Sequence, residues 1–374
     1  MPAHRTAIAL GLLGGAAVAF GACLLPEITV AEETETDPLP DAGPDTGPDV
    51  AVTGCVRATY PSPPGGADSV SVPDIVVAMH TIDMGEATPE PPGFDLDFTC
   101  TCFEEAGDSC STKLSQPRCD GPGGVDNAAS RLFKLVTDNL GEAYFGSDFY
   151  SSRADLGLWS VLFRLSGYNG TPNDPDVTVA LFVSSGTSGV TPLWDGTDQW
   201  SVSSDSLGPK GDVTDPLYLS DGGYVNDGVL VATLPSVALR LSGSEDTISV
   251  HLDGGVVSGL LVFDDVGAHI TKGVIAARWS EKEVFASLAS FRGPMGTMLC
   301  NDGGFVYNSV RANVCSNRDI LSDSIQAAAT PCDALSLGIG FEADPAMLGE
   351  VKMAAPPAGE CPMGQSPAED ACPP

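Results

Sequence analysis

Residues 158–183 read "LWSVLFRLSGYNGTPNDPDVTVALFV" and join two apolar stretches through a polar link. In the first stretch, Trp159 and Phe163 share one face and Arg164 lies on the other. In the second, 177–183, every other residue is a valine or leucine. An alternation with a period of two is typical of a β-strand with one buried face, and Gly, Asn, Asp and Pro favour tight turns. The segment therefore predicts two neighbouring strands.

Similar short strands are predicted at intervals of about ten residues along the rest of the chain. The candidate strands are 72–84, 94–102, 228–234, 236–242, 247–253, 256–263, 270–279 and 335–341. Helix-like periodicity with start and stop signals is confined to 121–141, 280–291 and 317–331. The sequence therefore predicts a mainly β fold with a few helices, in which antiparallel sheets pack as a sandwich or close into a barrel-like domain.

The stretch 94–102, "FDLDFTCTC", has two aspartates and two cysteines at alternate positions. As a strand it would place Phe94, Leu96 and the cysteines on one face, with Asp95 and Asp97 on the opposite, solvent-facing side. This arrangement disfavours a metal site shared by the aspartates and cysteines. Neighbours on one strand face rarely bond to each other, so Cys100 and Cys102 are expected to pair with separate partners, one of them a candidate link to the C-terminal cysteines.

Eleven cysteines are present, and ten remain when Cys23 is set aside. They fall into two clusters of five: Cys55, Cys100, Cys102, Cys110 and Cys119, and then Cys300, Cys315, Cys332, Cys361 and Cys372. In an exported chain such an even number predicts disulfides. Each cluster is odd, so complete pairing requires an odd number of bridges between them. The expected local pairs are Cys361 with Cys372 and Cys300 with Cys315, which leaves Cys332 to reach the early cluster.

The N-terminus combines Arg5 with an apolar run that is too short to span a bilayer and suits a secretory signal. It ends in Gly21, Ala22 and Cys23, and small residues before a cysteine resemble the lipobox of bacterial lipoproteins. Membership of that family implies cleavage after residue 22 and lipidation of Cys23. Leu24 after the cysteine favours the outer membrane or cell surface. The resemblance covers only this leader.

Residues 23–50 follow as an acidic, Pro-rich stretch without Lys or Arg, which predicts an extended disordered tether. Residues 51–354 are expected to form one β-rich, disulfide-stapled domain, and 355–374 an irregular Cys- and Pro-rich tail. The formal net charge of the chain is −33. A field of this sign repels phosphate backbones and anionic lipid, so we expect no nucleic-acid partner and membrane attachment through the lipid alone.

Residues that could carry chemistry are few. The histidines after the leader are isolated in sequence, and no Gly-x-Ser-x-Gly motif or Gly-rich phosphate loop occurs. Asp174 and Asp176 lie in an oxygen-rich turn, which makes calcium the one cofactor that the sequence leaves open, with Asx-turn capping as the simpler explanation. No catalytic residue is assigned.

A second candidate site lies in "PLWDGTDQW", 192–200. Trp194 and Trp200 flank Asp195 and Asp198, and aromatic rings beside carboxylates suit a sugar. The sequence as a whole favours an exported, surface-tethered lipoprotein with a non-catalytic structural or binding β domain, whose protein or glycan partner stays unknown. The alternative is a carboxylate-dependent hydrolase, or a carbohydrate-binding module, acting on envelope or extracellular polysaccharide.

Overall fold

The computed structural model describes residues 55–66, 71–102, 109–112, 118–242, 247–293, 296–354 and 360–373. The expected signal peptide, Cys23 and the acidic tether lie outside these residues. The strands are β1 (Ile75–Asp83), β2 (Ser160–Ser166), β3 (Asp174–Ser184), β4 (Gln199–Ser203), β5 (Tyr218–Asn226), β6 (Val229–Ser242), β7 (Thr247–Phe263), β8 (Ala268–Ser280), β9 (Arg292–Gly293), β10 (Thr297–Met298), β11 (Ala334–Pro345) and β12 (Met347–Lys352). The α-helices are α1 (Ala129–Leu140), α2 (Ser147–Asp155), α3 (Glu281–Ser290) and α4 (Phe305–Asn317).

The predicted mainly β, antiparallel fold is confirmed, and its sheet closes on itself. The strand order β7-β6-β5-β3-β2-β1-β11-β8 returns to β7 because β7 also pairs with β8. Strands β2 and β3, which the opening stretch predicts, pair in register with Phe163 opposite Leu181. The closed ring is therefore a barrel, and the short parallel pair β4–β12 extends it at β3.

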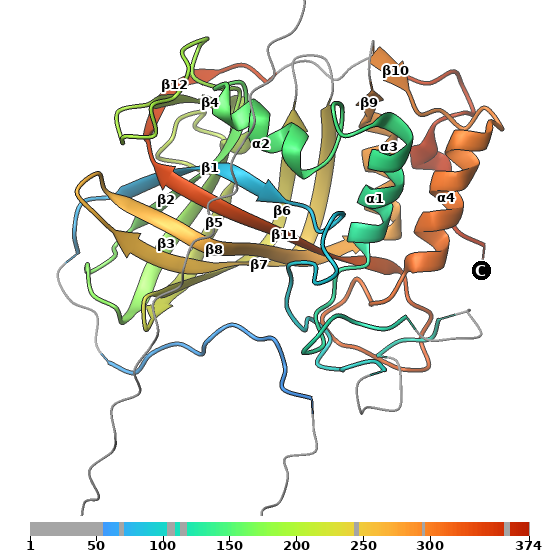
Figure 1. Ribbon diagram of the computed structural model, residues 1–374, viewed down its shortest axis with the longest axis horizontal. Coiled ribbons are helices and arrows are strands. Elements are labelled where there is room, and N and C mark those ends of the chain that lie inside the picture. Colours follow the sequence, from blue (N-terminus) through green and yellow to red (C-terminus); the bar gives the residue numbers. More distant parts are fainter. Residues whose placement is uncertain are drawn as a thin grey trace, which may run out of the picture. The chain divides into compact units, whose positions relative to one another are not determined.

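Alternate residues of the barrel strands make one large core. Phe163 of β2 and Phe341 of β11 stack with their ring centroids 5.2 Å apart. Helices α1, α3 and α4 gather at one side of the strands (Figure 1), and Phe133 and Phe285 contribute to the same core. Ser280 caps α3 by accepting a hydrogen bond from Glu283 N, as its capping-box sequence predicts. The helices thus complete the core that the strands begin.

Several expectations about secondary structure were wrong, among them three in the second half of the chain. The two strands predicted at 228–234 and 236–242 are the single strand β6, and 247–253 and 256–263 are both parts of β7. The helix predicted over 317–331 is irregular, and α4 ends at Asn317, where that helix was expected to start. Among the described residues, no helix is long and apolar enough to cross a membrane.

All ten cysteines in the described part of the chain form disulfides. The pairs are Cys55–Cys100, Cys102–Cys119, Cys110–Cys332, Cys300–Cys361 and Cys315–Cys372. One bridge joins the two clusters and uses Cys332, as expected, but its partner is Cys110. The predicted local pairs were wrong, because both cysteines of the tail reach back to the region of α4. Five disulfides indicate an oxidising, extracytoplasmic environment.

Candidate metal centre in a buried carboxylate cluster

Residues 94–102 form a loop, and the prediction of a strand here was wrong. Phe98 and Cys102 have left-handed backbones, with φ values of 59° and 70°, which interrupt any extended run. Thr99 N donates hydrogen bonds to Asp95 Oδ1 at 3.2 Å and to Asp97 Oδ1 at 2.8 Å. Such local bonds from aspartate side chains compete with a strand ladder. As a result Asp95 and Asp97 are buried, while Phe98 is 65% exposed.

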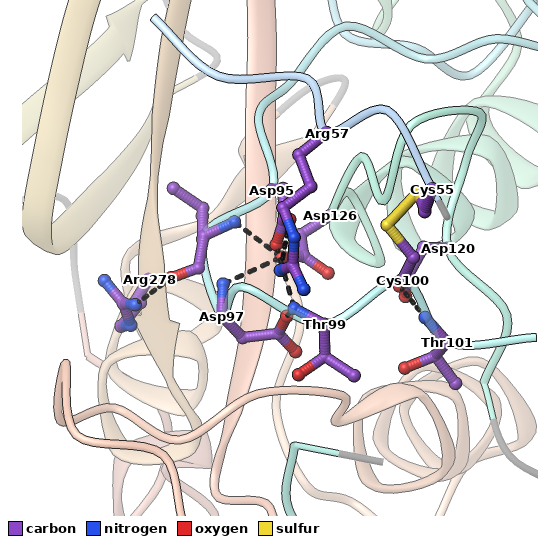
Figure 2. Close-up of polar contacts among 11 residues, drawn as sticks. Cys55, Arg57, Asp95, Asp97, Thr99, Cys100, Thr101, Asp120, Asp126 and Arg278 are labelled. Atoms are coloured by element: carbon purple, nitrogen blue, oxygen red, sulfur yellow. Dashed lines mark hydrogen bonds and ion pairs between the residues drawn. A yellow bond between two sulfur atoms is a disulfide. The ribbon is translucent and has the colours of Figure 1, made fainter. Parts of the chain in front are cut away.

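Asp126 joins the two loop aspartates from the segment that precedes α1. Its Oδ2 accepts hydrogen bonds from Leu96 N at 2.7 Å and from Asp97 N at 3.3 Å (Figure 2). One ligand oxygen from each of Asp95, Asp97 and Asp126 lies within 4.8 Å of the other two. We call these three residues the carboxylate cluster. Asp126 thus binds the loop and does not cap α1, whose N-cap position is Ala128.

The carboxylate cluster is held in place by covalent and steric constraints. The Cys55–Cys100 disulfide ties the N-terminal segment to the loop. Gly124, with φ of +73°, approaches so closely that an added Cβ would lie 2.9 Å from Cys100 Sγ and 3.2 Å from Asp95 Cγ. Only glycine combines this backbone conformation with so little space. The loop therefore folds around a site whose positions are fixed from several parts of the chain.

Two arginines face the carboxylate cluster. Arg57 Nη1 lies 2.9 Å from Asp95 Oδ2, and Arg278 of β8 donates from Nη2 to Leu96 O at 2.6 Å (Figure 2). Burial raises the pKa of Asp97 to about 6, and burial together with the nearby Asp97 charge raises that of Asp126 well above its usual range. Counting the described residues, three carboxylates face two guanidiniums, which leaves one negative charge in excess when all three carboxylates are ionised. Buried charge of this kind is stabilised by a proton or by a bound cation.

A buried hydroxyl lies beside the cluster. Ser109 is 6% exposed, and its hydroxyl lies close enough to Asp97 for a hydrogen bond that acts to lower the pKa of that carboxyl, although the geometry of the contact is poor. The hydroxyl oxygen thus lies next to the ligand oxygens of the cluster. Three carboxylates and a hydroxyl offer only oxygen ligands, which are the ligands that Ca²⁺ and Mg²⁺ prefer. The residues present therefore fit a hard divalent cation.

Two further carboxylates lie beyond the cluster, on the side of α1. Asp120 Oδ2 accepts a hydrogen bond from Thr101 N at 2.6 Å, and Asp319 accepts hydrogen bonds from both N and Oγ of Ser336. Burial raises their pKa values to about 8 for Asp120 and about 6 for Asp319. Both line a pocket of about 260 Å³ at the start of α1. These two half-buried acids thus lie between the cluster and a surface opening.

The predicted calcium site at Asp174 and Asp176 has a different geometry. Asp174 is fully buried, and its two oxygens accept hydrogen bonds from Asn169 N at 2.6 Å and Asp176 N at 3.1 Å. The Asp176 side chain is exposed. This is the Asx-turn capping that formed the simpler explanation of the sequence.

The residues of the predicted sugar site lie together but do not form an open aromatic surface, because Trp194 and Trp200 pack on each other with ring centroids 5.3 Å apart. Trp200 is fully buried in a small core outside the barrel, where no sugar can stack on it. Asp198 binds the backbone N–H of Leu193 and of Trp194, and Asp195 is exposed and holds Thr197. Only Trp194 keeps a partly exposed ring, which packs on His80 with centroids 5.1 Å apart.

The histidines are not all isolated, contrary to the expectation from the sequence. The Asp344 carboxylate of β11 lies between His80 of β1 and His269 of β8, at 2.9 Å from Nδ1 of His80 and 2.6 Å from Nδ1 of His269. The contact with Asp344 raises the pKa of His80, and contacts with Asp344 and Asp264 outweigh burial to raise that of His269. Three neighbouring strands bring these residues together, and no sequence spacing indicates it.

Comparisons of the chain with protein-family models, with curated proteins and with solved structures find no match. The assignment of the site therefore depends on its own geometry. The aspartates of "FDLDFTCTC" were visible in the sequence as a pair. Their convergence with Asp126 was not, because that contact spans about thirty residues and depends on the loop conformation.

Proposed function

We propose that this chain is an exported, surface-tethered, non-catalytic binding domain whose carboxylate cluster holds a divalent cation, Ca²⁺ by preference. The observation that carries the proposal is the convergence of Asp95, Asp97 and Asp126, which face two guanidiniums within the described part of the chain. Ca²⁺ accepts irregular sets of six to eight oxygen ligands, whereas Mg²⁺ demands near-ideal octahedral geometry. A cluster built from a loop and a helix-flanking segment suits the more tolerant ion.

The position of the cluster explains what the cation would do. The N-terminal segment, the 94–102 loop and Asp126 meet there, and Arg278 reaches it from the outer face of β8. Leu96 packs beside Ala276 of the same strand. A cation at this point would fasten the long β1–α1 connection to the barrel. It would also hold the adjacent pocket in one shape, since Asp120 and Asp126 flank the same short turn.

Ca²⁺ is expected to stabilise the purified protein against heat and urea relative to the same protein in EDTA. At a free concentration one hundred times the dissociation constant, the gain is about 2.7 kcal/mol. Asp126→Asn should remove most of it, because the amide supplies no negative charge. The measurement is the midpoint of thermal and urea unfolding with and without Ca²⁺.

Asp174→Asn is the matched control, because Asp174 is equally buried and also caps two backbone N–H groups. This variant should still be stabilised by Ca²⁺ even if its stability without Ca²⁺ is lower.

The stabilisation of the unmodified protein by Ca²⁺ should be larger at pH 8 than at pH 5. Because the folded-state pKa values of Asp97 and Asp126 are raised, protons on these groups stabilise the folded chain at low pH, and this contribution is lost as the pH rises through the folded-state pKa of each group, which is about 6 for Asp97. A chain that gains nothing from Ca²⁺ at pH 8 would show that the cluster needs no cation.

Attachment to the membrane is proposed from the leader alone. Gly21, Ala22 and Cys23 match the lipobox pattern, and the acidic stretch that follows suits a tether. Cys23→Ser is expected to move the protein from the membrane fraction to the soluble extracytoplasmic fraction, as measured by fractionation and immunoblotting. Leu24→Ser is the control and should leave the protein attached. Unchanged membrane attachment of Cys23→Ser would exclude the lipid anchor.

A further inference from the structure

The pocket at the start of α1 has an unusual charge for this molecule. The chain has 50 acidic and only 17 basic residues, yet Arg118, Arg131 and Lys134 line this one pocket together with the acids Glu86, Asp120 and Asp319. The Glu86 carboxylate already accepts hydrogen bonds from Ser147, which leaves Asp120 and Asp319 to face a ligand. Most of the surface of so acidic a protein repels anions. This pocket instead presents both signs of charge.

Lys134 forms an ion pair with Asp138 outside the pocket, at 3.0 Å, whereas the two arginines of the pocket are close to its acids without being paired with them. Burial and the nearby Arg131 charge lower the pKa of Arg118, and Arg131 and Asp319 also interact electrostatically. Even so, both guanidiniums bond to backbone carbonyls: Arg118 to Ser316 O at 2.6 Å and Arg131 to Cys119 O at 3.3 Å. Among the described residues, no ion pair joins either arginine to Asp120 or Asp319.

We propose that this pocket binds a small zwitterion, an α-amino acid, with its carboxylate at Arg118 and Arg131 and its ammonium group at Asp120 and Asp319. Guanidinium groups recognise carboxylates through charge-assisted hydrogen bonds. Ala128 and Ser130 at the start of α1 also line the pocket, and the dipole of that helix favours a negative group there. An ammonium group beside Asp120 would also offset the burial that raises the pKa of its carboxyl to about 8.

The size and lining of the pocket agree with this class of ligand. Its volume of about 260 Å³ lies just below the range of roughly 300–1,000 Å³ that is usual for drug-sized ligands. No tryptophan or tyrosine lines it among the described residues, so it lacks the aromatic surface on which a sugar ring would stack. The negative carboxylates disfavour a simple anion such as phosphate. A ligand with one charge of each sign satisfies both halves of the pocket.

The test is isothermal titration calorimetry of the full chain with each of the standard protein amino acids, in Ca²⁺ and again in EDTA. At least one amino acid should bind at one site per chain. Arg131→Gln, at an exposed position, and Asp120→Asn should each weaken binding at least tenfold, whereas Lys210→Gln and Asp212→Asn, remote from the pocket, should not change it. Acetate alone and methylamine alone should bind at least tenfold more weakly than the amino acid.

Binding of no amino acid, or binding that Arg131→Gln and Asp120→Asn both leave intact, would overturn the proposal. Equal affinity for acetate or inorganic phosphate would also overturn it, because it would identify a plain anion site. The proposal for the pocket and the proposal for the carboxylate cluster can be refuted independently. Asp126→Asn reports on the cation, and Arg131→Gln on the zwitterion.

Discussion

Replacing both Cys110 and Cys332 by serine is expected to lower the free energy of unfolding by about 5 kcal/mol. This bridge closes a loop of 222 residues, far longer than the loops of the other four disulfides. In the chain-entropy view, a longer loop gives more freedom back to the unfolded chain when the bridge is removed. Both cysteines are buried, and with Leu321 they form a small core that holds residues 109–112 against the start of β11.

The Cys102–Cys119 bridge provides the comparison. It spans only 17 residues, so the corresponding double serine variant should lose about 3 kcal/mol. Both variants keep the other four disulfides, and urea unfolding at constant pH and Ca²⁺ measures the difference. If the Cys110 and Cys332 variant lost no more stability than the Cys102 and Cys119 variant, the long-range bridge would not reduce the conformational entropy of the unfolded chain as expected. That result would also contradict the idea that this bridge stabilises the domain by joining the early and late cysteine clusters.

The β architecture could be predicted because the information is local. In β2 and β3 the alternating residues that the sequence places on one face, such as Phe163 and Leu181, lie in the barrel core, while the opposite face is covered by a second, small core. The lengths of β6 and β7 could not be predicted, because Pro235 and Gly254 look like strand ends. In the structure these two residues stand opposite each other, and the register on either side of them continues unchanged. Pro235 has no N–H to donate to β7, but the strand pair tolerates this one missing hydrogen bond because the pairing continues on both sides of it.

The carboxylate cluster could not be predicted for the opposite reason. The period of two in "FDLDFTCTC" is real, but the backbone N–H groups of Leu96 and Asp97 bond to Asp126 and not to a neighbouring strand. Arg278 lies 182 residues from the Leu96 carbonyl that it binds. The conformational preference of a short segment contains no information about hydrogen-bond partners so far away in the sequence. The strand interpretation also assumed that charged side chains prefer solvent. Functional sites are where this assumption most often fails.

Arg278→Met is expected to lower the free energy of unfolding in EDTA by about 3–5 kcal/mol, because it removes one positive charge from a buried set of opposite charges and leaves the carboxylates without it. Arg278 is 6% exposed, its Nη2 binds Leu96 O, and the charges of Asp126 and Asp97 act on it. Methionine fills most of the space of the arginine side-chain stem. The loss of stability therefore measures mainly the removal of the charge and of the hydrogen bond. Arg292→Met is the matched control, since Arg292 is 4% exposed, binds carbonyl oxygens and lies away from the cluster.

The response of Arg278→Met to Ca²⁺ separates two explanations of the cluster. If the arginines alone neutralise the aspartates, Ca²⁺ will restore little of the lost stability. If a cation completes the site, removing one competing positive charge should strengthen Ca²⁺ binding, so the gain from Ca²⁺ should exceed that of the unmodified protein. Adding Asp126→Asn to Arg278→Met should cancel this extra gain and recover part of the stability lost in EDTA, because one negative charge then leaves with one positive charge. Additive losses in this double-variant cycle would mean that Arg278 and Asp126 do not share one electrostatic site.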